Sequence, residues 1–285
     1  MNAIADITPA APRIDRPVLR ISMIYMLTGL VIFLSMGVLG LLMRLDHAGW
    51  HALSADWFYR IMTIHGVGMV SGMLLAAMGG MSAALSRSQA LRARWLWAAY
   101  FIYSLSLAFL LYAVLIGRFA GAWTALDPLP FHGLTWDKWA GVMMYVAFLC
   151  VGVGFTIYCQ LLFLTLRRAY GGIGGALGWR YLFSRGPVDS NLRVPSPVEL
   201  SAMAVSIVGL ITGIVGLAVL LPLFAEAAGW ISHVNPLYTK NFLMSFGHAL
   251  ANLTIYLAVG LVYALLPTFT KRGGQTSKLI VLAWN

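Results

Sequence analysis

Residues 241–267, NFLMSFGHALANLTIYLAVGLVYALLP, decide the fold class because they form an apolar run long enough to cross a membrane. A transmembrane α-helix needs roughly 20 predominantly apolar residues. Near the start of this run stands one ionisable side chain, His248. A second run, FYRIMTIHGVGMVSGMLLAAMGG (58–80), similarly carries His65 near its start. Ionisable residues inside a membrane are costly to dehydrate, so both histidines mark candidate functional sites.

The composition of the whole chain predicts a helical membrane protein. The 285 residues are 60% hydrophobic and only 10% charged, with a mean hydropathy of +0.83, which is far from the values of soluble domains. Runs of spanning length recur at 20–43, 60–85, 95–117, 138–166, 198–224 and 241–267, and SKLIVLAWN (277–285) has the pattern of a further start. We therefore expect an all-α polytopic transmembrane bundle of six spans plus the start of a seventh. It would form a single membrane domain over 1–285, with a cytoplasmic tail at 1–19.

The net charge of +10 indicates how the chain is oriented in its membrane. If the N-terminus lies inside, most of the 19 Lys and Arg residues fall in the tail and the inside loops, and the outside segments hold only Arg44, Arg60, Arg118, Lys138 and Lys240. Positive charge concentrated on one side is typical of cytoplasmic loops. The pattern predicts a multi-pass protein of the cell's inner (plasma) membrane with a cytoplasmic N-terminus, and no nucleic-acid partner.

Small and sulfur-containing residues in the spans are expected to serve packing. Cys150 and Cys159 lack the further cysteines of a metal or disulfide framework. Glycines recur at spacings that let helices approach closely, at Gly66, Gly68, Gly72, Gly79 and Gly80 and again at Gly209, Gly213 and Gly216. Those around His65 would also leave space beside its imidazole for a flat ring such as a porphyrin.

Only two of the six histidines fall in spans, His65 and His248. The other four, His47, His51, His132 and His233, lie in outside loops and are expected to be solvated or interfacial. Neutral imidazole is the commonest metal ligand in proteins and a usual axial ligand of haem. The two histidines in spans are therefore either ligands or hydrogen-bonded packing residues. The orientation above places both at similar depth near the outer surface, which favours cofactors arranged in a layer.

Three segments resemble subunit I of the haem-copper oxidases, which include cytochrome c oxidase. YRIMTIHGVGM (59–69) is similar to the family's second helix, where such a histidine is an axial ligand of the low-spin haem. NPLYTKNFLMSFGHALANLTIYLAVGLVYALLP (235–267) resembles the sixth helix, where the histidine after glycine ligates the active-site copper. GAWTALDPLP (121–130) resembles the outer loop between the third and fourth helices. The similarity follows the helix order of the N-terminal half of subunit I.

The resemblance implies an oxidoreductase, a respiratory terminal oxidase that reduces oxygen to water coupled to electron transport and proton translocation. The implied cofactors are low-spin and high-spin haem and copper, with His65 on the low-spin haem iron and His248 on copper. The family's other ligands lie on the seventh and tenth helices, so we expect this chain to be incomplete and inactive alone. The implied partners are the lipid bilayer, subunit II, the missing C-terminal half, oxygen, and cytochrome c or quinol as electron donor.

The sequence departs from the mitochondrial-like branch of that family at two sites. Where that branch has a proton-relaying glutamate and a cross-linked tyrosine, this chain has Leu250 and Asn252. The nearest downstream tyrosine, Tyr256, is the candidate catalytic residue, although it lies about two turns along the helix and about 80° round it from His248. The loop SRSQALRARW (86–95) also lacks the aspartate and asparagine of that branch's proton entry. The resemblance is therefore to the non-mitochondrial-like branches.

Two alternative functions stay open at the level of sequence. Nitric oxide reductases of the same superfamily normally carry iron in the copper position and glutamates near it, and the sequence around His248 has no such glutamate. The other alternative is a non-catalytic haem-anchoring or transporter-like membrane subunit, in which His65 and His248 relay protons or pack. Metal content and haem spectra distinguish these alternatives.

Overall fold

Helices make up the regular secondary structure of the part of the chain that the computed structural model describes, residues 15–50, 53–122, 136–185, 192–271 and 276–285. In chain order they are α1 (Arg16–His47), α2 (Ala55–Leu85), α3 (Ala93–Leu111), the π-helix η1 (Tyr112–Ile116), α4 (Lys138–Ala169), α5 (Ile173–Ala176), α6 (Trp179–Leu182), α7 (Pro197–Ala228), α8 (Pro236–Thr270) and α9 (Lys278–Ala283). Six segments are long and apolar enough to cross a membrane, namely α1, α2, α3 with η1, α4, α7 and α8. The prediction of an all-α bundle with six spans is confirmed. At the expected start of a seventh span the structure has α9, a helix of 6 residues.

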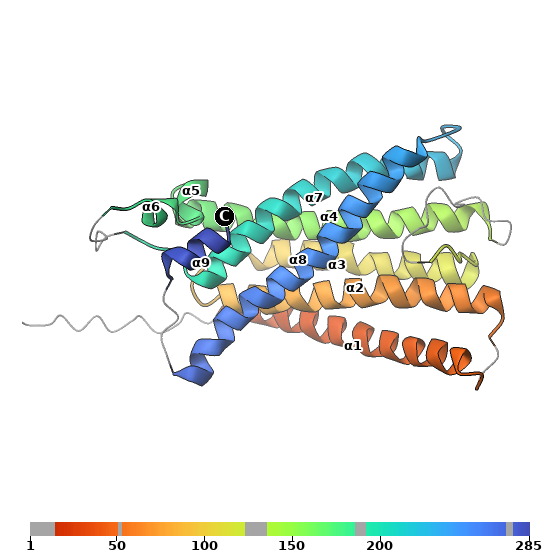
Figure 1. Ribbon diagram of the computed structural model, residues 1–285, viewed down its shortest axis with the longest axis horizontal. Helices are drawn as coiled ribbons and strands as arrows, with labels where there is room; N and C mark the ends of the chain where they lie inside the picture. The colour runs from red at the N-terminus through yellow and green to blue at the C-terminus, as the bar shows by residue number, and fades with distance from the viewer. Residues whose placement is uncertain (1–14, 51–52, 123–135, 186–191, 272–275) are drawn as a thin grey trace, which may run out of the picture.

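The long helices alternate in direction and pack into one bundle (Figure 1). We call the end at which α1 begins the inner end and the opposite end the outer end. Helix α1 packs on α2, α3 on α4, α4 on α7 and α7 on α8, and α8 crosses back onto α2. The largest buried apolar core draws most of its side chains from α2, α4 and α7, and α8 contributes Phe246, Leu250, Leu253 and Leu257. One face of α8 therefore packs onto this core.

Glycines let the helix backbones approach each other at several crossings. A Cβ on Gly29 of α1 would lie 2.5 Å from the carbonyl oxygen of Gly72 on α2. A Cβ on Gly209 of α7 would collide with Sγ of Cys159, which is fully buried on α4. Helix backbones can approach this closely only where the residue is glycine. Gly72, Gly209 and Cys159 thus serve helix packing, as the sequence predicted.

Polar capping residues start two of the spans before their apolar runs begin. Ser54 accepts a hydrogen bond from the backbone N–H of Trp57, so α2 begins at Ala55. Asn235 accepts two such bonds at the start of α8, which begins at Pro236. The predicted starts at 60 and 241 were too late, because a capped first turn is stable without apolar side chains. As a result, His65 and His248 each lie about three turns inside their helices.

A buried carboxylate, Glu199, joins three helices at the inner end. Its side chain is 4% exposed. It accepts hydrogen bonds from the side chains of Ser88 and Gln89 beyond α2, from the Tyr170 hydroxyl at the end of α4 (2.8 Å), and from both the backbone N–H and the hydroxyl of Ser196 (2.8 and 2.7 Å). Burial, and then the neighbouring carboxylate, raises the pKa of Tyr170 above its usual value. The phenol consequently keeps its proton and remains a donor.

Replacing Glu199 by alanine is expected to destabilise the folded bundle by about 3 kcal/mol, because buried donors would lose a charged acceptor. Tyr170→Phe removes only one of these donors and should cost about 1 kcal/mol. Thermal unfolding of the two variants in the same detergent measures the difference. If Glu199→Ala melts no lower than Tyr170→Phe, the carboxylate does not hold these helices together.

Candidate functional site

The imidazole of His65 is half-buried between α2 and α1. Its Nδ1 atom lies 2.7 Å from the backbone carbonyl oxygen of Met36. A carbonyl oxygen can only accept a hydrogen bond, so Nδ1 carries the proton and donates it. The lone pair of the neutral ring is therefore on Nε2, for which the described residues provide no hydrogen bond. A histidine held in this way, with its second nitrogen bonded to a carbonyl, is typical of metal ligation.

Gly40 of α1 allows the His65 ring to lie close to the helix backbone. A Cβ at Gly40 would lie 2.8 Å from Cε1 of the imidazole, so a larger residue would displace the ring. From the sequence we had expected Gly66 and Gly68 to leave the space beside the imidazole. In the structure a Cβ on Gly68 would collide with the side chain of Met36. The sequence does not indicate that Gly40 contacts His65. This contact depends on how α1 packs on α2.

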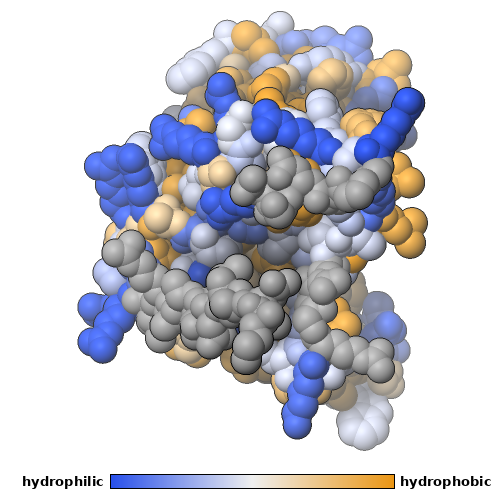
Figure 2. Space-filling view, turned by 90° about the vertical axis from the view of Figure 1, so that its left-hand side faces the viewer, coloured by the Kyte–Doolittle hydropathy of each residue, from blue (hydrophilic) through white to orange (hydrophobic). Residues whose placement is uncertain are grey.

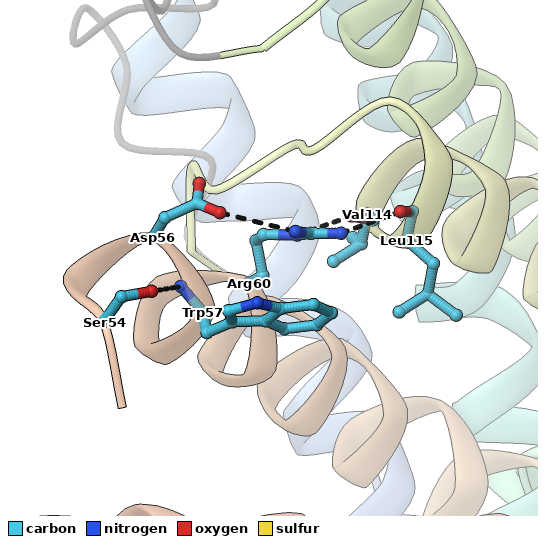
Figure 3. A network of polar contacts seen from close by, with 6 residues as sticks. All are labelled: Ser54, Asp56, Trp57, Arg60, Val114 and Leu115. Carbon is cyan, nitrogen blue, oxygen red and sulfur yellow. Dashed lines mark hydrogen bonds and ion pairs between the residues drawn. The ribbon is translucent and has the colours of Figure 1, made fainter. Parts of the chain in front are cut away.

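Arg60, five residues before His65, fixes the outer part of α2 to the end of the third span (Figure 3). Its Nε donates to the carbonyl of Val114 (2.9 Å) and its Nη2 to that of Leu115 (2.7 Å), both in η1. Nη1 lies 3.3 Å from a carboxylate oxygen of Asp56, and the guanidinium stacks over Trp57. The Arg60 side chain is only 5% exposed, so it is buried within the outer part of α2. These contacts fix the position of α2 along the bundle axis relative to α3. They thereby fix the depth of His65.

His248 lies on the side of α8 that faces away from the bundle. Its side chain is exposed, and a Cβ added to the preceding Gly247 would meet no atom within 4 Å. Neighbouring positions on the other side of the helix, such as Phe246 and Leu250, are buried against the core. Across the described residues, no three His, Cys, Asp or Glu side chains come together as a metal site. The chain thus offers a single imidazole at this position.

Tyr256 lies further toward the inner end of α8, and its side chain is 44% exposed. Its ring packs edge-on against Trp284 with centroids 6.0 Å apart, and Tyr263 makes a similar contact at 6.4 Å. The structure thus joins Tyr256 to the segment after α9 and not to His248.

The two histidines of the spans lie on helices that diverge toward the outer end. At the inner end α8 packs on α2, where a Cβ on Gly80 would meet Leu261. Nearer the outer end α8 packs on α7, where Phe246 fills the space beside Gly216. Figure 1 shows the resulting diagonal path of α8 across the bundle. His65 and His248 are therefore not brought together by the described residues.

The remaining histidines lie at the outer end or outside the described residues. His47 packs against Phe58, with ring centroids 5.0 Å apart and the ring planes tilted by 35°. His233 is exposed between α7 and α8. His51 and His132 fall outside the described residues, as does most of the segment GAWTALDPLP.

Comparison with known proteins identifies the family to which these features belong. Residues 20–284 match the family described as cytochrome C and quinol oxidase polypeptide I. No curated protein matches the chain. The family match spans almost the entire sequence and includes both α2 with His65 and α8 with His248. The chain belongs to the cytochrome c and quinol oxidase polypeptide I family and is part of a haem-copper oxidase subunit I, a membrane-embedded oxidoreductase.

Proposed function

We propose that this chain is part of a respiratory terminal oxidase that reduces oxygen to water and couples this reaction to electron transport and proton translocation. The observation that carries the proposal is the hydrogen bond from His65 Nδ1 to the Met36 carbonyl. It fixes the tautomer and the orientation of the ring and leaves Nε2 free to bind iron. A histidine retained only for packing gains nothing from a second nitrogen left without a partner in an apolar environment.

The residues of this chain fit the cofactors of the family in distinct ways. His65 would bind the low-spin haem iron through Nε2, and Gly40 keeps the backbone of α1 clear of the ring. His248 would supply one imidazole to copper, to which imidazole ligands are well suited. Tyr256 is the tyrosine of this chain that we assign to the active site. When bound, the high-spin haem and copper supply the oxygen-binding centre. Around it, the apolar spans exclude water, so that uptake of an electron without a proton leaves a costly unpaired charge.

We infer that further ligands of both metals come from other parts of the oxidase. This chain provides one intramembrane histidine for each metal, whereas a closed site needs several ligands. We infer that the C-terminal half of subunit I completes both sites, with subunit II and either cytochrome c or quinol delivering electrons. Nitric oxide reduction, and a non-catalytic or transporter-like role, are the outcomes that would replace this function.

The purified complete complex is expected to show haem absorption in the visible range, to contain copper, and to consume oxygen. Spectra, elemental analysis and an oxygen electrode measure these three properties. Nitric oxide consumption with iron in place of copper would establish the reductase instead. Absence of haem would indicate a transporter-like subunit.

The distribution of basic residues leads us to expect the N-terminus on the cytoplasmic side of the plasma membrane. A protease-sensitive tag at the N-terminus should be protected in right-side-out vesicles. The same tag inserted between α7 and α8, near His233, should be cleaved. The reverse pattern would show that the inner end of the bundle faces outward.

A further inference from the structure

A pocket of about 300 Å³ lies at the inner end, between the end of α4, the α5–α6 connection and the segment that leads into α7. This volume falls at the lower end of the range for small-molecule sites, about 300–1,000 Å³. Figure 2 looks onto this end of the molecule, where hydrophilic residues are spread across the surface. Neither His65 nor His248 lines the pocket. It is therefore separate from the sites assigned to metals.

The pocket carries positive charge. Arg180 and Arg193 both line it, and the described residues contribute no Asp or Glu to its lining. Neither arginine forms a salt bridge with a described residue. The guanidinium carbon of Arg193 lies 4.8 Å from the ring centroid of Tyr170, which also lines the pocket. Glu199 accepts a hydrogen bond from the hydroxyl of this tyrosine but does not itself line the pocket.

Glycines form part of the pocket wall and leave the backbone accessible. Gly171 and Gly178 line the pocket with φ angles of +66° and +73°. Residues with a side chain rarely adopt this left-handed conformation. At Gly171 an added Cβ would meet no atom within 4 Å, so a ligand can approach the main chain there while its charge meets the two arginines. Guanidinium groups bind phosphate oxygens through paired N–H donors.

Apolar side chains beside the pocket indicate the source of the anion. Phe183, just after α6, and Leu279 of α9 are each 74% exposed. Tyr181 lines the pocket two residues before Phe183, and its ring centroid is 5.9 Å from Nζ of Lys278, the residue before Leu279. Basic pockets flanked by apolar surface at the cytoplasmic ends of spans suit the phosphate of an anionic lipid, whose acyl chains then lie along the apolar side.

We propose that this pocket binds a phosphate group, supplied by the headgroup of an anionic phospholipid, through Arg180 and Arg193. The bound headgroup bridges the end of α4, the α5–α6 connection and the start of α7. This site does not depend on the reaction that the oxidase catalyses.

The test uses the complete complex, delipidated in detergent and then titrated with phosphatidylglycerol or phosphatidylcholine. Lipid retained in native mass spectrometry and the shift in melting temperature are measured together. We expect at least a tenfold preference for phosphatidylglycerol, lost in Arg180→Gln/Arg193→Gln. The control Arg92→Gln/Arg94→Gln removes the same charge from exposed positions at the inner end and should keep the preference.

Three further results decide the proposal. An unchanged haem spectrum in the double variant shows that the complex is folded, and Arg180→Lys/Arg193→Lys keeps the charge if folding fails. Equal loss in the pocket and control variants would overturn the site, because charge alone would then explain binding. Pyrophosphate binding that depends on Arg180 and Arg193, without lipid retention, would keep the phosphate site but overturn the lipid as its source.

Discussion

Replacing His65 by alanine should abolish the low-spin haem absorption of the complete oxidase. The ring donates from Nδ1 to the Met36 carbonyl 2.7 Å away, so Nε2 is the nitrogen available to iron. Alanine removes this nitrogen, and the described residues offer no other histidine near it. Loss of the entire low-spin signal is expected, not a shift, because an axial ligand is removed. Reduced-minus-oxidised spectra of the purified complex measure it.

Two further variants separate ligation from a general loss of structure. His47→Ala removes a histidine at the outer end, where the ring packs against Phe58, and should leave the spectrum unchanged. Gly40→Ala should retain the haem but shift its absorption or reduction potential, since the added methyl must displace the imidazole. A wild-type spectrum in His65→Ala would show that this histidine is not an axial ligand.

The helices could be predicted from the sequence because each span carries its own signal. An apolar run of spanning length needs no knowledge of its neighbours, and all six runs became helices. The starts at Ala55 and Pro236 were missed because Ser54 and Asn235 cap polar turns that hydropathy does not detect. The capping residues upstream of each run indicate the correct starts of α2 and α8.

The candidate site was predictable only in part, because its contacts are made between helices. His65 and His248 stand out as ionisable residues in apolar runs. The carbonyl of Met36 and the backbone of Gly40 become partners of His65 only through the packing of α1 on α2. The partners of Arg60 could not be predicted for the same reason, since the carbonyls that accept its hydrogen bonds belong to a different span. No spacing along the sequence encodes such pairings.

The second large effect is expected at His248, where the number of ligands decides whether copper binds. The imidazole lies on the outward side of α8, and it belongs to no group of three or more His, Cys, Asp or Glu side chains among the described residues. A single imidazole binds copper weakly, because a stable site shares the metal among several ligands. The isolated 285-residue chain is therefore expected to hold no stoichiometric copper.

In a complex that supplies the missing helices, His248 should become indispensable to copper. His248→Ala is expected to reduce copper from stoichiometric to background in elemental analysis, while the low-spin haem that we assign to His65 remains visible. His233→Ala, at an exposed position before α8, is the matched control and should keep the metal. Tight copper in the isolated chain would mean that the ligands lie elsewhere. Unchanged copper in the His248→Ala complex would exclude this imidazole as a ligand. The exposed ring of His248 would then serve only to pack against another helix of the complex.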